Sequence, residues 1–176
     1  MATTTWTLAN LLSWIAKLSA LVLASGLMSA VVVYALTARR AERELRRQKL
    51  EALYMHTTNY CTTLGIVYLN YVYAMRGKLS LNQVYDMTKD RGTDNERSFD
   101  NVRMLVAIYF PEMQPLLDEV LACRDALSKI TREFTEDYKT GHEGTSHIKP
   151  LNDALARLSR VEGEFKDAIV KRAHAL

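Results

Sequence analysis

The stretch of sequence that decides the fold is residues 18–38, LSALVLASGLMSAVVVYALTA, which carries no charged side chain and stops against Arg39 and Arg40. A helix of this length extends about 31 Å, because each residue adds about 1.5 Å, and this matches the hydrocarbon core of a bilayer. We therefore predict a single transmembrane helix over 18–38. The rest of the chain holds no second run of that length and apolarity.

Two other interpretations of this run are weaker. A cleaved secretory signal has a basic start and an apolar stretch of only about 7 to 15 residues. Residues 1–14 carry no charged side chain and the run is longer than that, although Ala24 and Gly26 could mimic a cleavage site. A buried helix of a soluble protein does not need apolar residues on all its faces followed by a basic stop.

The charges beside the run predict its orientation, since Lys and Arg near the ends of a span stay on the cytoplasmic side. Only Lys17 precedes the run, whereas residues 39–49 form a basic juxtamembrane stalk that holds Arg39, Arg40, Arg43, Arg46, Arg47 and Lys49. The body after the stalk should be cytoplasmic, and a bacterial inner membrane suits this layout. Two cysteines, Cys61 and Cys123, fit a reducing compartment.

The formal net charge of +3 and the isoelectric point of 8.8 are compatible with a nucleic acid partner. The basic excess, however, lies in the stalk, where it would meet anionic lipid headgroups, and the body is nearly neutral. We therefore expect membrane lipid as one partner and no nucleic acid.

Residues 1–17 read as an amphipathic, interfacial segment. Trp6 and Trp14 suit the membrane interface, and a polar stripe of Asn10, Ser13 and Lys17 lies on one helical face. In the alternative interpretation the helix is continuous from about residue 5 and Lys17 enters the bilayer. A charge there is costly unless it faces a cavity or another subunit, so this stripe is also a candidate oligomer or pore surface.

Residues 50–176 are predicted to form an all-α, antiparallel bundle of about four helices. The apolar pattern has helical spacing throughout, without strand-like alternation. The first helix should continue from the span and end at Gly77, with its core positions at steps of three and four: Leu50, Leu53, Thr57, Tyr60, Leu64, Val67, Tyr71 and Ala74. This length suits one core and is too short for two ordinary domains.

Local signals set the limits of the remaining helices. Ser80 and Gln83 have the spacing of a capping box, and the polar stretch 89–96 should interrupt that second helix. Pro111 should separate it from a third helix that ends at Gly141, and the last helix should begin after Thr145 or Ser146.

The sequence offers no strong chemistry, and we expect no catalytic site, metal or cofactor. His142, Glu143 and His147 lie in one turn, but their spacing matches no strong zinc pattern. His56 and Cys61 lie five residues apart, on different faces of a helix, so they are a poor nucleophile and base pair.

Tyrosine is dense between residues 54 and 85, and Tyr68 and Tyr73 fall outside the predicted core positions. Because tyrosine is enriched at interfaces, these two residues are a candidate partner surface, with a thick core as the alternative.

Three hypotheses of function follow. The first is a single-pass membrane-anchored bundle that acts as a non-enzymatic scaffold or regulator through a protein partner or self-association. The alternative is an oligomeric membrane effector, such as a pore gated by its cytoplasmic bundle. The third, a sensor of a small ligand, would need an internal polar site that the core pattern does not supply.

Overall fold

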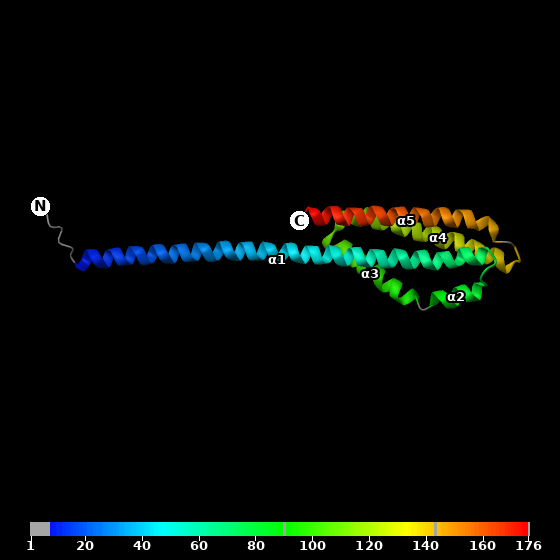
Figure 1. The fold of residues 1–176 in the computed structure, drawn as a ribbon, viewed down its shortest axis with the longest axis horizontal. Helices are drawn as coiled ribbons and strands as arrows, with labels where there is room; N and C mark the ends of the chain where they lie inside the picture. The colour runs from blue at the N-terminus through cyan, green and yellow to red at the C-terminus, as the bar shows by residue number, and fades with distance from the viewer. Residues whose placement is uncertain (1–7, 90, 143, 176) are drawn as a thin grey trace. The chain divides into compact units, whose positions relative to one another are not determined.

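The computed structural model describes residues 8–89, 91–142 and 144–175, and all regular structure in those ranges is helical (Figure 1). Side chains are not described for residues 8–12, 15–16, 18–28 and 91–94 within the helices. The chain divides into two compact units, Met1–Leu45 and Arg46–Leu176. The predicted all-α class and the helical bundle are confirmed.

The first unit consists, in its described part, of the beginning of α1 (Leu8–Met75). The helix begins before the predicted span and passes through Lys17 without a break, as the alternative interpretation of this segment expected. Where the structure describes side chains, it contains no helix with both the length and the apolarity to cross a membrane. The side chains of residues 18–28, which form half of the predicted span, are not among those described. The transmembrane helix over 18–38 therefore stays a prediction.

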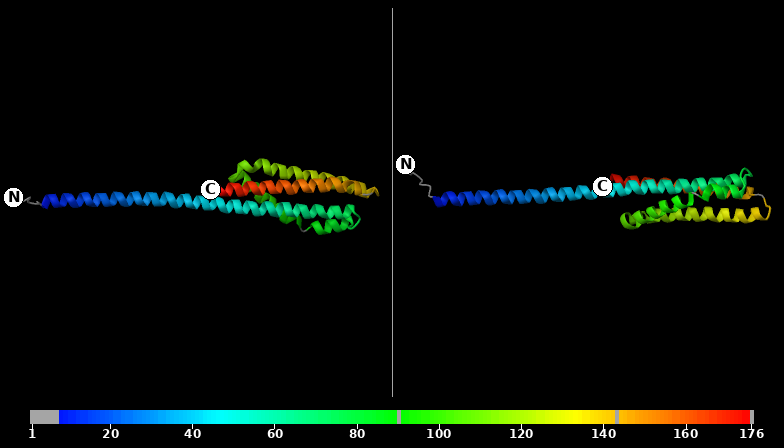
Figure 2. Two further views of the ribbon diagram at one scale, coloured as in Figure 1. Left: turned by 45° about the horizontal axis from the view of Figure 1, so that its top comes forward. Right: turned by 90° about the horizontal axis from the view of Figure 1, so that it is seen from below.

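The second unit is a helical bundle. It contains the rest of α1, followed by α2 (Leu81–Lys89), α3 (Arg91–Tyr109), a short 3-10 helix (Pro111–Met113), α4 (Gln114–Lys139) and α5 (Thr145–His174). The left view of Figure 2 shows α4 and α5 running side by side. The predicted second helix is thus two helices, α2 and α3.

Contacts between side chains give the direction of each helix relative to α1. On α3, the Phe99 ring stacks on Tyr60 at 5.0 Å, and Lys49 lies 5.5 Å from the Tyr109 ring, so higher numbers on α3 meet lower numbers on α1. At the start of α5, Gly144 lies against Met75 at the end of α1, and farther along α5 Lys166 lies 5.6 Å from the ring of Tyr54. These pairs make α3 and α5 antiparallel to α1, as predicted for the bundle.

The helix ends follow the local signals in the sequence. Gly77 and Gly141 both have positive φ, 70° and 80°. After α1, the Lys78 N–H donates to the Tyr73 carbonyl at 2.9 Å, which is the six-to-one bond of a Schellman cap. Before α2, the Ser80 N–H donates to the Gln83 side chain at 2.8 Å, which confirms the predicted capping box.

Two details of the prediction are wrong. Arg91 and Gly92, expected in a break within 89–96, already belong to α3, and residue 90 lies outside the described part. Toward the end of α1, the predicted core positions Val67 and Tyr71 are only partly buried, whereas Tyr68 and Val72 are buried. The prediction alternated steps of three and four, which gives a period of 3.5 residues. An α-helix has 3.6 residues per turn, so the buried face drifts from that pattern by about 20° per heptad and has moved on by one residue at Tyr68 and Val72.

Candidate functional site

A stripe of exposed side chains on α1 is the most distinctive surface of the bundle. Between Met55 and Met75, α1 exposes six residues, and they recur at steps of four and three: Met55, Asn59, Thr62, Ile66, Leu69 and Tyr73. We call this set the α1 stripe. The regular spacing places all six on one face of the helix, opposite the face that packs into the core.

The α1 stripe is uncharged and largely apolar although it faces solvent, and Asn59 and Thr62 are its two polar members. Met55 is 60% exposed, Leu69 43% and Ile66 38%. Single exposed apolar residues are ordinary on a protein surface, but a contiguous apolar row marks an interaction site. None of the six side chains is charged, and depletion of charge is typical of the centre of protein interfaces.

A groove adjoins the stripe at its Met55 end. The open groove has a volume of about 660 Å³ and is lined by Leu50, Tyr54, Met55, Ile169 and Val170, among others. Its floor residues Leu50 and Ile169 are buried, whereas Val170 is 42% exposed. The groove surface therefore extends from α1 onto α5 at this end of the bundle, and Arg47, Glu51 and His174 are polar members of its lining.

The two tyrosines of the predicted partner surface, Tyr68 and Tyr73, differ in burial. Tyr73 is exposed and belongs to the α1 stripe. Tyr68 is only 8% exposed, and its hydroxyl lies 2.7 Å from the Ser128 hydroxyl of α4. Burial raises the pKa of Tyr68, and the Ser128 hydrogen bond opposes this rise. The expectation that Tyr68 lies on an accessible surface is wrong, because the drift of the helix turns it into the core.

Sequence reasoning missed the other five residues of the stripe. The signal was present, because Met55, Ile66 and Leu69 follow the same steps of three and four as the core positions. In this part of α1, one apolar row packs into the core of the bundle, and the second row, the α1 stripe, is exposed.

The residues predicted at the membrane interface lie mostly on open surface. Trp14 is 59% exposed, and Lys17 is also exposed, whereas Trp6 lies outside the described residues. Arg39, Arg40, Arg43, Arg46 and Arg47 are exposed. Lys49 is partly buried beside the Tyr109 ring, so it belongs to the bundle as much as to the stalk.

The candidate pore stripe is described in part. Ser13 and Lys17 are exposed on α1, and the side chain of Asn10 lies outside the description. Three residues separate Ser13 from Lys17 within the unbroken helix, so the two side chains lie on one face. Their role in an oligomer or pore stays a prediction.

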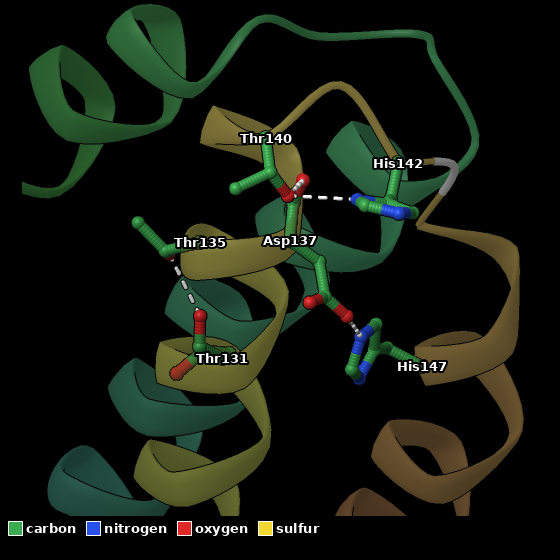
Figure 3. Close-up of polar contacts among 6 residues, drawn as sticks. All are labelled: Thr131, Thr135, Asp137, Thr140, His142 and His147. Carbon is green, nitrogen blue, oxygen red and sulfur yellow. Dashed lines mark hydrogen bonds and ion pairs between the residues drawn. The ribbon is translucent and has the colours of Figure 1, made fainter.

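The turn between α4 and α5 holds the candidate metal ligands, and Figure 3 shows that its two histidines face different partners. His147 Nε2 lies 2.8 Å from a carboxylate oxygen of Asp137, and His142 Nδ1 lies 2.7 Å from the Thr140 hydroxyl. Glu143 lies outside the described residues. Within the described part, the structure contains no group of three or more His, Cys, Asp or Glu side chains that could hold a metal.

The contacts of His147 indicate a structural role. Its side chain is only 14% exposed, and its ring packs edge-on to the Phe134 ring with centroids 6.1 Å apart. Asp137 and Phe134 belong to α4, and His147 belongs to α5. These contacts fasten the start of α5 to the end of α4.

The two cysteines are buried and free. Burial raises the pKa of the Cys61 thiol to about 12, and the nearby carboxylate of Glu162 adds to the rise. Burial likewise raises the pKa of Cys123. Because the thiolate is the reactive form, Cys61 is a poor nucleophile at neutral pH.

Comparison of the chain with known protein families, characterised proteins and solved structures gives no match.

Proposed function

We propose that the chain is a single-pass, membrane-anchored scaffold or regulator that presents a helical bundle to a protein partner at the cytoplasmic face. The observation that carries this proposal is the α1 stripe, an uncharged and largely apolar row exposed on one helix. The row matches the composition expected at the centre of a protein interface. Residues 18–38 serve as the anchor, and the basic stalk contacts anionic headgroups.

The role is non-enzymatic. The buried thiol of Cys61 has a pKa of about 12, so it is not poised as a nucleophile. The His147 ring contacts Asp137 of α4 and so joins α5 to α4, and the His142 ring contacts the Thr140 hydroxyl within the turn. The Cys61 thiol and the His147 ring thus contribute to packing within the bundle. The exposed, largely apolar α1 stripe is the surface that we assign to binding.

Site-specific photocross-linking in membranes tests this proposal. A photoreactive residue would replace Ile66 in the stripe, and the matched control would replace Glu164, an exposed residue of α5. We expect the full chain to remain with membranes after alkaline carbonate extraction. A discrete adduct should form from position 66 and not from position 164. Release by carbonate, or no adduct from position 66, contradicts the proposal.

Exchange of the anchor is the second part of the test. If residues 18–38 serve only to hold the bundle at the membrane, an unrelated span of equal length will preserve the adduct from position 66. Loss of the adduct despite correct insertion would mean that the span itself takes part in binding.

The alternative, an oligomeric membrane effector, is favoured by one observation. The helix is continuous through Ser13 and Lys17, and both side chains are exposed on it. In this function Lys17 lines a space between subunits, so Lys17→Leu abolishes an ion leak from cells that express the chain. As a scaffold, the chain gives no leak with Lys17 or Leu at that position.

A further inference from the structure

We propose that the partner of the α1 stripe is a second copy of this chain, which pairs with it in parallel and in register. This inference rests on the proposed function, because it uses the same surface and names its occupant. The heptad positions of the stripe, the groups beside it and its area each bear on the choice of occupant.

The steps of the stripe fix the heptad positions of its residues. Asn59, Ile66 and Tyr73 take position a, and Met55, Thr62 and Leu69 take position d. A β-branched residue at a with leucine at d favours two-stranded parallel pairing, and Ile66 with Leu69 has this arrangement. The central pair of the stripe, Ile66 with Leu69, thus has the arrangement that favours a parallel two-stranded coiled coil.

Asn59 distinguishes parallel from antiparallel pairing. In a parallel pair in register, Asn59 faces Asn59 of the second copy, so each amide can donate to and accept from the other. An antiparallel pair about the middle of the stripe would place Asn59 against Leu69, and the amide would lose water without gaining a partner. A single asparagine at position a is a known device for fixing register.

The charges beside the stripe are compatible with a second copy. The six stripe residues are uncharged, so two copies bring no like charges together along the row. Glu51 takes position g and His56 takes position e, and these positions face each other across a parallel pair. Glu51 is exposed and bonded to Arg47 at 3.2 Å within its own chain, and it would lie opposite the imidazole of the second copy.

The small area of the stripe means that pairing of two copies would depend on the membrane anchor. From residue 55 to residue 73 the row extends about 27 Å, and a helix face is about 10 Å wide, which gives an area of about 270 Å². A standard interface buries about 800 Å² on each partner. Two bundles in solution therefore pair weakly, whereas two bundles anchored in one membrane share an orientation and a high effective concentration.

Disulfide trapping of the full chain in membranes tests this inference. Cysteine would replace Leu69 or Thr62, both at position d, where the Cα atoms of two parallel helices lie within the range that a disulfide spans. Two versions of each variant with tags of different mass would be co-expressed and oxidised. We expect the hybrid dimer to be the major species, at twice the 20.0 kDa of one chain plus the tags.

Control variants make the result specific. Glu164→Cys lies on the exposed face of α5 and should remain monomeric, as should the parent chain, whose two cysteines are buried. In the Thr62→Cys chain, Leu69→Glu should abolish the dimer, whereas Leu69→Met should retain it. A hybrid dimer between Asn59→Cys and Leu69→Cys, stronger than either symmetric one, would overturn parallel pairing.

The outcomes separate this inference from the proposed function. Monomer alone from Leu69→Cys and Thr62→Cys, together with a photo-adduct from position 66 whose mass is not that of two chains, overturns the second copy and leaves the scaffold proposal standing. No adduct and no disulfide overturns both. A hybrid disulfide that survives Leu69→Glu overturns the role of the α1 stripe.

Discussion

The two faces of α1 in the bundle are both largely apolar, yet they have different surroundings. The inner face, with Leu53 and Leu64, is buried, and the outer face, with Ile66 and Leu69, remains exposed. The exposed side chains of α5 include many charged ones, among them Asp153, Arg157, Arg160, Glu164 and Asp167. Apolar spacing therefore predicts a helix without telling which of two rows folds the chain and which is left for a partner.

The largest difference between the two faces should appear when the same truncation is made on each. Leu53 is 0% exposed and Leu69 is 43% exposed on the same helix. We expect Leu53→Ala to lower the free energy of unfolding by about 2 to 5 kcal/mol, because it leaves a cavity in the core. Leu69→Ala should lower it by less than about 1 kcal/mol. Urea unfolding of the full chain in detergent, followed by circular dichroism, measures both.

Equal losses from the two truncations would contradict the comparison. They would mean that the outer face contributes to folding in the single chain, and the α1 stripe would lose its claim to be a surface for a partner.

The second-largest effect should be a loss of stability at alkaline pH, caused by two buried groups on the inner face of α1. Burial raises the pKa of Cys61 from its usual 9.0 and that of Tyr60 from its usual 10.0, each to about 12. The folded pKa lies above the unfolded one, so the contribution to stability is complete below pH 9 and is lost as the pH rises toward 12. Each group reduces the free energy of unfolding by up to about 1.4 kcal/mol per pH unit above its unfolded pKa.

Urea unfolding between pH 8 and pH 11 measures this dependence. The parent chain should show no loss from these two groups at the start of the range and a steepening loss from about pH 9 upward. Cys61→Ala removes one thiol and should make the loss above pH 9 smaller, because Cys123, whose pKa burial also raises, still contributes there, and Tyr60 adds to the loss from about pH 10. An identical pH profile for the parent and Cys61→Ala would show that the buried thiol does not contribute.

The smallest effect concerns a hydroxyl on each face. Tyr68→Phe removes the hydroxyl that lies 2.7 Å from Ser128, and we expect a loss of about 1 kcal/mol in the free energy of unfolding. Tyr73→Phe, on the outer face, should change it by less than about 0.5 kcal/mol. Thermal unfolding of the two variants gives the comparison, and a larger loss from Tyr73→Phe would place that hydroxyl in an intramolecular bond.

The sequence was sufficient to predict the helical class and most helix ends, because these depend on neighbouring residues. Gly77 and Gly141 adopt the positive φ that favours glycine, and Ser80 with Gln83 forms the capping box. Each of these signals acts within one turn of helix, so a single sequence contains all the information that they need.

The sequence was not sufficient where small errors accumulate along the helix. The predicted core positions match at Leu50 and Leu53, yet the buried residues near the end are Tyr68 and Val72 in place of Val67 and Tyr71. That drift also decides the candidate site, because it buries Tyr68 and leaves Tyr73 at the end of the exposed row. Which face of a helix meets a neighbour depends on tertiary packing, and the local sequence pattern does not contain that information.

The antiparallel order of the bundle has a consequence for the synthesis of the chain. Tyr54 of α1 contacts Lys166 of α5, so this part of α1 gains its neighbour on α5 only from residues made about 110 positions later. At roughly 5 to 20 residues per second, a ribosome needs about 6 to 20 s to make them. Until α5 is made, the part of the inner face that α5 covers stays open beside the outer face, so a nascent chain presents to chaperones more apolar surface than the finished bundle does.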